Sequence, residues 1–205
     1  MPSDWELLQS WREGDRQAGD ALVGRYLGAI RRFFRHKLES GEDDLVQRTF
    51  VACVEAAARF EARSSFRTFL YAIARNVLLD HLRAVHRDSL RGPGEFDPSV
   101  SSLCAFDTSP SQALAGKESA ARLLRALRSV PLDAQLLLEL YYWEELSVAE
   151  LAEVLVLPEG TIKGRLHRAR QALHERMAKD VAAALGDAEG DPGALFGSLR
   201  PRIFE

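Results

Sequence analysis

The sequence predicts an all-α protein made of two small helical domains joined by a flexible linker. Apolar residues recur at helical spacing over residues 4–87 and again over 118–185. No run of alternating β-branched residues indicates a strand. Between the two periodic stretches, residues 91–116 contain three prolines, several serines and few bulky apolar groups, which is typical of a flexible linker.

Helical periodicity and its interruptions predict eight helices. The expected bounds are 4–13, 18–38, 42–59, 65–87, 118–129, 133–143, 147–155 and 159–182. No proline interrupts the first four, and Pro158 stands where the last helix would begin, a position that tolerates its missing N–H group. The first four helices would form an N-terminal domain over residues 1–90, and the last four a C-terminal domain over residues 117–182. Residues 183–205 form an apolar, Gly- and Pro-interrupted tail, which either packs on a domain or binds a regulator.

The composition excludes several classes of protein. Of the 205 residues, 46% are hydrophobic and 28% are charged, which is typical of a folded globular protein and not of a disordered chain. No stretch approaches the roughly 18 apolar residues of a membrane span, and the first residues lack the pattern of a secretory signal. Two cysteines are too few for a disulfide framework or a four-cysteine zinc site, and Cys53 is expected to be a buried thiol. We expect a cytoplasmic protein without a cofactor or metal.

Known catalytic motifs are absent from the sequence. It has no Gly-rich phosphate loop, no H-E-x-x-H zinc motif and no nucleophile elbow. His81 and His86 are five residues apart, a spacing that suits a shared metal poorly on a helix. We therefore expect a binding protein and not an enzyme.

The strongest local pattern is a helix-turn-helix over residues 147–173. Ser147 and Glu150 have the spacing of a capping box, in which each side chain bonds the other residue's amide at the start of a helix. In the second helix, one apolar stripe is formed by Ile162, Leu166, Ala169 and Leu173. The opposite face carries Thr161, Lys163, Gly164, Arg165, His167, Arg168 and Gln171. An apolar back with a basic and small-polar front is what a recognition helix needs in the major groove.

The local charge supports this interpretation although the total charge does not. The chain carries 27 basic and 30 acidic residues, a net charge of −3, whereas nucleic-acid-binding domains are usually basic. Residues 158–179, however, contain six basic and two acidic residues, for a net charge of +4. The preceding residues 132–157 contain six acidic residues and no lysine or arginine. A solvated amphipathic helix would explain the basic face alone, but it does not explain the capped helix and tight turn before it.

Aromatic and arginine residues alternate in the N-terminal domain. The aromatic residues are Phe60, Phe66, Phe69 and Tyr71, and the arginines are Arg59, Arg63, Arg67 and Arg75. Such a combination can stack unpaired bases and hold phosphates. The alternative is a hydrophobic core, which we expect for Phe66, Phe69 and Ile73 because of their helical spacing.

Three segments together resemble a known family. LAEVL at 151–155 followed by LPEGTIKGRLHRAR at 157–170 resembles the promoter-reading helix-turn-helix of extracytoplasmic-function sigma factors, the small two-domain members of the main bacterial sigma family. DDLVQRTF at 43–50 resembles the family's polymerase-clamp-binding helix, and SFRTFLYAIARNVLLDHLR at 65–83 resembles its −10 element helix. The order and spacing of the segments also agree, and the resemblance covers about residues 4–182.

The resemblance implies a sigma factor that binds core RNA polymerase at its β′ clamp and β flap. Such a protein directs promoter-specific initiation by recognising −35 duplex and melted −10 DNA. An anti-sigma factor or another regulator is a further expected partner, and membrane insertion is not expected. The linker acids Glu95, Asp97 and Asp107 would mimic nucleic acid in the RNA path of the polymerase.

Three sets of residues receive roles from the resemblance. Contacts with the −35 duplex are implied for Thr161, Lys163, Gly164, Arg165, His167, Arg168 and Arg170, of which Arg165 and Arg170 suit phosphates. Contacts with unpaired −10 bases are implied for Arg59, Phe60, Ala62, Arg63, Ser64, Ser65, Asn76 and Arg83. Contacts with the β′ clamp are implied for Asp43, Asp44, Gln47 and Phe50.

Two positions depart from the family pattern. The turn of the helix-turn-helix commonly carries glycine, and this chain has Val156 there. If the position requires a positive φ, a β-branched residue is strained in it. Gly164 stands where serine is common, which removes a polar group and leaves room for a closer approach to the DNA backbone.

Two other functions remain open from the residues alone. A conventional helix-turn-helix repressor or activator would need a dimerisation or effector domain where this chain has arginines and aromatic residues. A structural helical module would leave the basic face of residues 161–171 unexplained.

Overall fold

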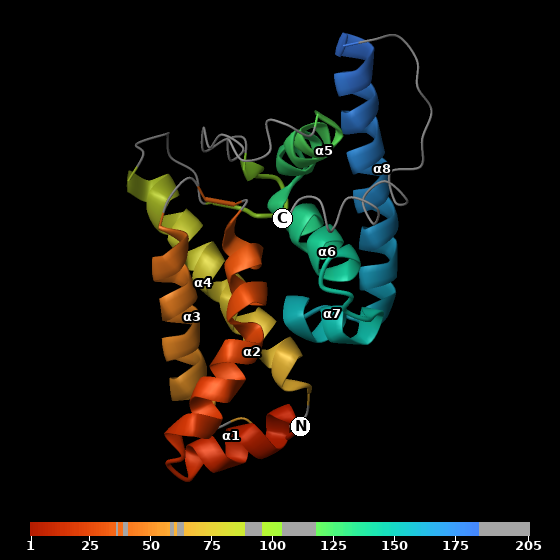
Figure 1. The fold of residues 1–205 in the computed structure, drawn as a ribbon. Helices are drawn as coiled ribbons and strands as arrows, with labels where there is room; N and C mark the ends of the chain where they lie inside the picture. Colours follow the sequence, from red (N-terminus) through yellow and green to blue (C-terminus); the bar gives the residue numbers. More distant parts are fainter. Residues whose placement is uncertain are drawn as a thin grey trace. The chain divides into compact units, whose positions relative to one another are not determined.

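A computed structural model describes residues 1–35, 37–38, 41–57, 60, 64–88, 96–103 and 118–184. In these ranges all regular secondary structure is helical (Figure 1). The helices are α1 (Asp4–Arg12), α2 (Arg16–Arg35), α3 (Glu42–Ala57), α4 (Phe66–Asp88), α5 (Glu118–Ser129), α6 (Leu132–Tyr142), α7 (Val148–Leu155) and α8 (Glu159–Ala184). The predicted all-α fold is confirmed, and every predicted helix is present with ends that differ by at most three residues. Within the described ranges, no helix combines the length and apolarity needed to cross a bilayer.

The chain divides into two compact units, each of which has its own packing. Helices α1–α4 lie in the first unit, and α5, α6 and α8 lie in the second. The domain boundaries that composition suggests stay predictions, because residues 89–95 and 104–117 lie outside the described part of the chain.

In the first unit, α2 packs against α1 and α3, and α3 packs against α4. Its core contains buried apolar residues from three helices: Leu22, Ile30 and Phe34 of α2, Leu45 and Cys53 of α3, and Leu70 and Leu78 of α4. The contact of α1 with α2 is close, because a Cβ atom added at Gly19 would lie 2.5 Å from Nε1 of Trp11. Only glycine therefore fits at this point without moving the indole ring.

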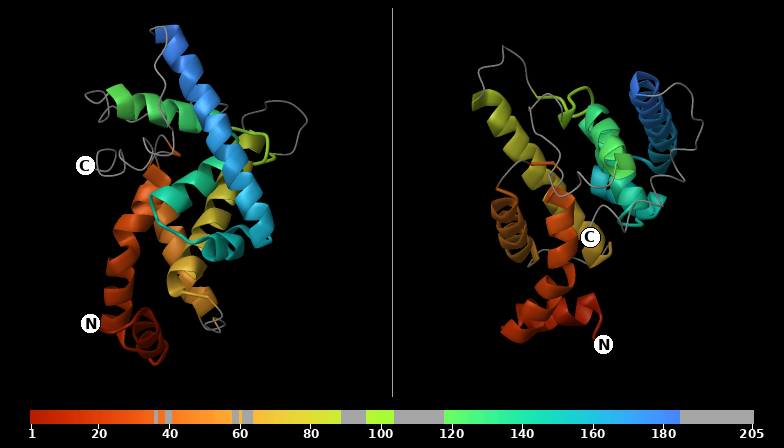
Figure 2. Two further views of the ribbon diagram at one scale, coloured as in Figure 1. Left: turned by 90° about the vertical axis from the view of Figure 1, so that its right-hand side faces the viewer. Right: turned by 45° about the horizontal axis from the view of Figure 1, so that its top comes forward.

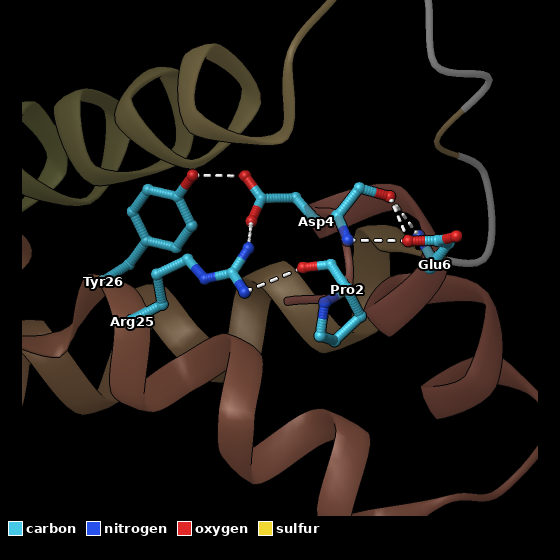
Figure 3. Close-up of polar contacts among 6 residues, drawn as sticks. Pro2, Asp4, Glu6, Arg25 and Tyr26 are labelled. Atoms are coloured by element: carbon cyan, nitrogen blue, oxygen red, sulfur yellow. Dashed lines mark hydrogen bonds and ion pairs between the residues drawn. The ribbon is translucent and has the colours of Figure 1, made fainter.

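Polar contacts attach the start of α1 to α2 (Figure 3). Ser3 and Glu6 form a capping box that begins α1. The Asp4 carboxylate accepts hydrogen bonds from Arg25 and from the Tyr26 hydroxyl, both on α2. Arg25 also donates to the carbonyl of Pro2 at 3.0 Å. These bonds hold the first turn of α1 in register with the middle of α2.

In the second unit, α5 and α6 both pack against α8 (Figure 2). The apolar stripe of α8 predicted from periodicity is buried: Ile162, Leu166, Ala169 and Leu173. Glu139, near the end of α6, is also buried and accepts a hydrogen bond from Gln135 at 2.8 Å.

Within the predicted linker of residues 91–116, the described residues 96–103 bond to the start of α6. The carbonyl of Ser101 accepts from the amide of Leu132 at 2.9 Å, and the carbonyl of Pro98 accepts from the amide of Asp133 at 3.0 Å. Pro131, which precedes α6, supplies no side-chain cap for that helix. Because the first amides of a helix lack partners within it, the backbone of this segment takes the place of a capping side chain. The segment therefore belongs structurally to the second unit.

Candidate nucleic-acid interface

A reciprocal cap begins α7, as the sequence predicts. The Glu150 amide donates to the Ser147 hydroxyl at 3.2 Å, and the Ser147 amide donates to the Glu150 carboxylate at 2.9 Å. Two of the unpaired amides at the start of the helix are thereby satisfied. The predicted capping box is confirmed, and it fixes where the first helix of the helix-turn-helix begins.

A left-handed residue ends α7. Val156 has a φ of +55°, and its side chain is 82% exposed. The amide of the next residue, Leu157, donates to the carbonyl of Ala152 at 2.9 Å, which is the bond that closes a Schellman motif. Because its φ is positive, the backbone of Val156 is strained: a β-branched residue occupies a conformation that glycine normally takes. The carbonyl of Pro158 then accepts from the amides of Thr161 and Ile162 and starts α8.

The face of α8 opposite the buried stripe is open to solvent. Lys163, Gly164, His167 and Arg168 are exposed, and Thr161 is half-buried near the start of the helix. No heavy atom lies within 4 Å of a Cβ atom built at Gly164. The exposed face thus presents two cationic side chains, one imidazole and, at Gly164, a position without a side chain.

Arg165 and Arg170 have a different environment from the other predicted −35 contacts. Both are half-buried, and both bond to α6. Arg165 lies 3.4 Å from the Asp133 carboxylate, and Nε of Arg170 donates to the Tyr142 hydroxyl at 2.7 Å. Helical periodicity puts Arg165 and Arg170 beside the basic face, but their guanidinium groups contact Asp133 and Tyr142 of α6.

The predicted −10 residues other than Phe60 fall into three groups. Arg59, Ala62 and Arg63 lie outside the described residues. Asn76 is exposed on α4, as is Arg83, which pairs with Asp80 at 2.9 Å. Ser64 is half-buried, and Ser65 is exposed.

The hydroxyl of Ser65 forms hydrogen bonds at the start of α4. It accepts from the amide of Thr68 at 3.1 Å and lies 2.8 Å from the Thr68 hydroxyl. This is the geometry of an N-cap for α4. Ser65 therefore defines the helix start and also stands at the surface beside it.

Phe60 is a packing residue in this structure. It is 9% exposed, and its ring centroid lies 4.6 Å from that of Phe69 and 6.3 Å from that of Trp5. Its carbonyl also accepts a hydrogen bond from Arg12 at 3.0 Å. The core alternative thus describes the Phe60 ring better than a free stacking platform does. The Arg12 contact was not predicted, because no sequence pattern indicates a bond between residues 48 positions apart.

The four predicted polymerase contacts lie on α3, and three of them are exposed. Asp43 pairs with Arg31 at 2.8 Å, and Asp44 lies 3.8 Å from Arg48. Gln47 is exposed, and Phe50 is half-buried. Both ion pairs are largely solvated, so they restrain these carboxylates weakly.

Sequence reasoning missed an apolar continuation of this α3 surface. Val51 and Val54 are about half exposed, at 50% and 49%. Val54 also lines a cavity of about 500 Å³ together with Leu8, Trp11, Arg12 and Ala57. Val51 and Val54 therefore present apolar surface on the same helix as the exposed polar residues Asp43, Asp44 and Gln47.

Cys53 is a buried thiol, as predicted. It is fully enclosed in the core of the first unit, and burial raises its pKa to about 12. Among the residues that the structure describes, no group of three or more His, Cys, Asp or Glu side chains is arranged to hold a metal.

Comparison with known proteins agrees with the order of these elements. The family model of Sigma-70 region 2 matches residues 22–88, and that of Sigma-70 region 4 matches residues 120–173. The chain is 32% identical over 183 residues to the RNA polymerase sigma-H factor of Pseudomonas aeruginosa, covering 85% of this chain and 93% of that protein. It is 27% identical over 184 residues to the ECF RNA polymerase sigma-E factor of Escherichia coli, covering 85% and 94%. The chain belongs to the extracytoplasmic-function (ECF) sigma factors.

Solved structures resemble this ECF sigma factor along most of its length. CnrH, solved in complex with the cytosolic domain of CnrY, has a TM-score of 0.64 at 25% identity and covers 87% of this chain and 99% of its own. The sigma factor RpoE from Bartonella quintana, solved with the anti-sigma factor NepR, has a TM-score of 0.60 at 26% identity and covers 77% and 95%.

The region 2 match lies within the first unit of the ECF sigma factor, and the region 4 match contains residues of α5, α6 and α8, which lie in the second unit. The region 2 match begins within α2 and ends with α4, so it leaves α1 outside. The region 4 match covers the helix-turn-helix and ends at Leu173, the last residue of the buried stripe on α8. As a sigma factor, the chain binds core RNA polymerase and directs promoter-specific initiation, which excludes the repressor and the purely structural module.

Proposed function

We propose that the exposed face of α8 reads the −35 duplex. The observation that carries this proposal is the separation of faces on α8, where Lys163, His167 and Arg168 stand in solvent opposite a fully buried stripe. A helix with this arrangement can enter a major groove without losing its packing. We expect Thr161, at the start of the helix, to contact the DNA backbone, and the open space around Gly164 supports a close approach.

The test is run-off transcription with core polymerase in the presence and absence of the chain. The template is DNA selected by the wild-type holoenzyme from a pool randomised upstream of the start site. Arg168→Ala is expected to reduce initiation on this template and to leave core binding intact. Arg176→Ala is the matched control, because Arg176 is also an exposed arginine on α8 but lies beyond the region 4 match. Equal loss of initiation and core binding in Arg168→Ala would refute the assignment to DNA.

The first unit is proposed to hold the melted −10 strand at the start and along the surface of α4. Exposed Asn76 and Arg83 support this, since an amide can pair with a base edge and a guanidinium with phosphate. Ser64 and Ser65 complete the described part of the surface, and Arg59, Ala62 and Arg63 stay predictions. Permanganate reactivity of unpaired thymines in the open complex measures this contact, and Asn76→Ala is expected to reduce it. Unchanged reactivity and initiation in Asn76→Ala would remove that residue from the surface.

Core polymerase is proposed to bind α3 at Asp43, Asp44, Gln47 and Phe50. The support is that α3 exposes the acid and amide groups of Asp43, Asp44 and Gln47 and, after them, the apolar Val51 and Val54. Asp44→Lys inverts a charge that the structure leaves largely solvated. It is expected to weaken core binding while leaving far-UV circular dichroism unchanged. Undiminished core binding would exclude Asp44 from the contact.

We further propose that a protein regulator of the anti-sigma type binds this chain. We also propose that the chain itself acts in the cytoplasm and that it acts by binding alone. The solved complexes of CnrH with CnrY and of RpoE with NepR support the first point. Family membership supports action in the cytoplasm and by binding alone, because promoter DNA and core polymerase are the partners of a sigma factor. Asp97 is exposed, and the hydrogen bond from the Ser99 amide lowers its pKa, so a carboxylate stands at the surface of a segment that the resemblance assigns to the RNA path. A candidate regulator is tested by whether it lowers run-off transcription when it is added before core polymerase.

A further inference from the structure

Two neighbouring tyrosines at the end of α6 hold Arg170 of α8. Nε of Arg170 donates to the Tyr142 hydroxyl at 2.7 Å. Its Cζ atom lies over the rings of Tyr141 and Tyr142, at 5.4 and 5.5 Å from their centroids. The two rings pack edge to face, with centroids 5.0 Å apart. A cation within about 6 Å of a ring centroid is attracted to the ring, so the guanidinium is bound by a hydrogen bond and two aromatic faces at once.

A second contact joins the same two helices at the other end of α6. Arg165 lies five residues before Arg170 on α8, and its guanidinium is 3.4 Å from the carboxylate of Asp133. Asp133 stands in the first turn of α6, whereas Tyr142 is its last residue. The two contacts therefore act at opposite ends of α6, in addition to the buried apolar stripe.

Two such contacts restrict rotation of α8 about its own axis. Successive side chains on an α-helix are separated by about 100°, so the direction of each is fixed once the helix cannot turn. Arg168 lies between Arg165 and Arg170 in the sequence and points to solvent. The direction of the Arg168 side chain is therefore set by the contacts that α6 makes with Arg165 and Arg170.

We propose that Tyr142 is a positioning residue for the recognition helix and that it acts through Arg170. Arg170 affects promoter recognition by fixing the orientation of α8 and not by contacting phosphate. This inference rests on the proposed reading of −35 DNA by α8, and it changes the role that the family resemblance implies for Arg170. It also makes Tyr142 matter to DNA binding although it lies on a different helix from the reading face.

The test is a double-mutant cycle on the full chain assembled with core polymerase. The probe is a duplex selected by the wild-type holoenzyme from a randomised pool. Tyr142→Phe removes one oxygen atom, and Arg170→Ala removes the charge. Tyr142→Phe is expected to weaken binding roughly tenfold, the effect of about one charge-assisted hydrogen bond. Arg170→Ala also removes the two ring contacts and should weaken binding at least as much, and the double variant should be no weaker than Arg170→Ala.

Salt dependence separates positioning from phosphate contact. Loss of a phosphate contact reduces the slope of log K against log salt concentration by about one. Arg168→Ala should show that reduction, whereas Tyr142→Phe and Arg170→Ala should keep the wild-type slope. Arg170→Lys keeps the charge but not the planar group, so it is expected to bind as weakly as Arg170→Ala.

Three results would overturn the inference: a reduced slope in Arg170→Ala, wild-type binding by Arg170→Lys, or additive losses in the double variant. Circular dichroism and core binding of each variant report on folding, and Tyr142→Phe keeps the test decisive if Arg170→Ala fails to fold. Failure of the proposed function looks different, because Arg168→Ala would then leave both affinity and slope unchanged.

Discussion

The turn of the helix-turn-helix carries strain that one substitution should remove. Val156 has a φ of +55°, in the region that costs a non-glycine residue about 1–2 kcal/mol. Val156→Gly would recover that cost, less about 0.4–1 kcal/mol for the more flexible unfolded chain. Because the valine side chain is 82% exposed, little core packing is lost with it. The net gain is about 1 kcal/mol, or about 4–8 °C in Tm for a domain of 60–100 residues.

Hydrogen exchange followed by mass spectrometry measures this gain where it arises. Amides of α7 and of the first turns of α8 should exchange about fivefold more slowly in Val156→Gly, because their opening becomes less favourable. The end of α1 provides a matched control. Gly14 has a φ of +100° there, and the Asp15 amide donates to the Ser10 carbonyl at 2.9 Å in the same motif. Gly14→Val should accelerate exchange in α1. The reasoning would be refuted by unchanged or faster exchange of α7 in Val156→Gly.

Three further outcomes are expected from the local chemistry. Ser147→Ala breaks the capping box with Glu150 and should cost about 1 kcal/mol in urea unfolding, whereas Ser147→Asp should restore most of it. Burial and the hydrogen bond to Asp4 raise the pKa of Tyr26. Its contribution to stability is therefore complete below the ordinary tyrosine pKa of about 10 and falls as the pH rises above it, and Tyr26→Phe should reduce this pH dependence of unfolding. Cys53 should resist iodoacetamide at about pH 8 in the folded chain and react in urea, because burial raises its pKa to about 12; rapid alkylation of the folded chain would contradict its enclosed position.

The helices were predictable because their signals are local. The capping box of Ser147 and Glu150 and the stripe that begins at Ile162 depend on residues within a few turns of one another. The segment 96–103 was not predictable in this way. Its proline and three serines are typical of a linker, but two of its carbonyls meet amides about 30 residues later, at the start of α6. Composition describes the segment itself and not the unpaired groups that it will meet.

The candidate site shows the same division. Periodicity correctly separated the exposed and buried faces of α8, as Arg168 and Leu166 illustrate. It did not separate Arg168 from Arg170, because the difference comes from Tyr142 on another helix. Phe60 was ambiguous for a similar reason, since only the ring contacts with Phe69 and Trp5 distinguish packing from base stacking.

The open space around Gly164 separates two demands on the recognition helix. A new side chain at this position would meet no heavy atom within 4 Å of its Cβ atom, so packing leaves room for any residue that the helix tolerates. The residue nevertheless lies between Lys163 and Arg165, on the face proposed to meet base edges. Divergence between duplicated copies of such a gene could therefore change promoter preference here in a single step, without first acquiring a compensating mutation in the core. For an engineer, the same position is where a library of reading specificities can be built on one unchanged scaffold.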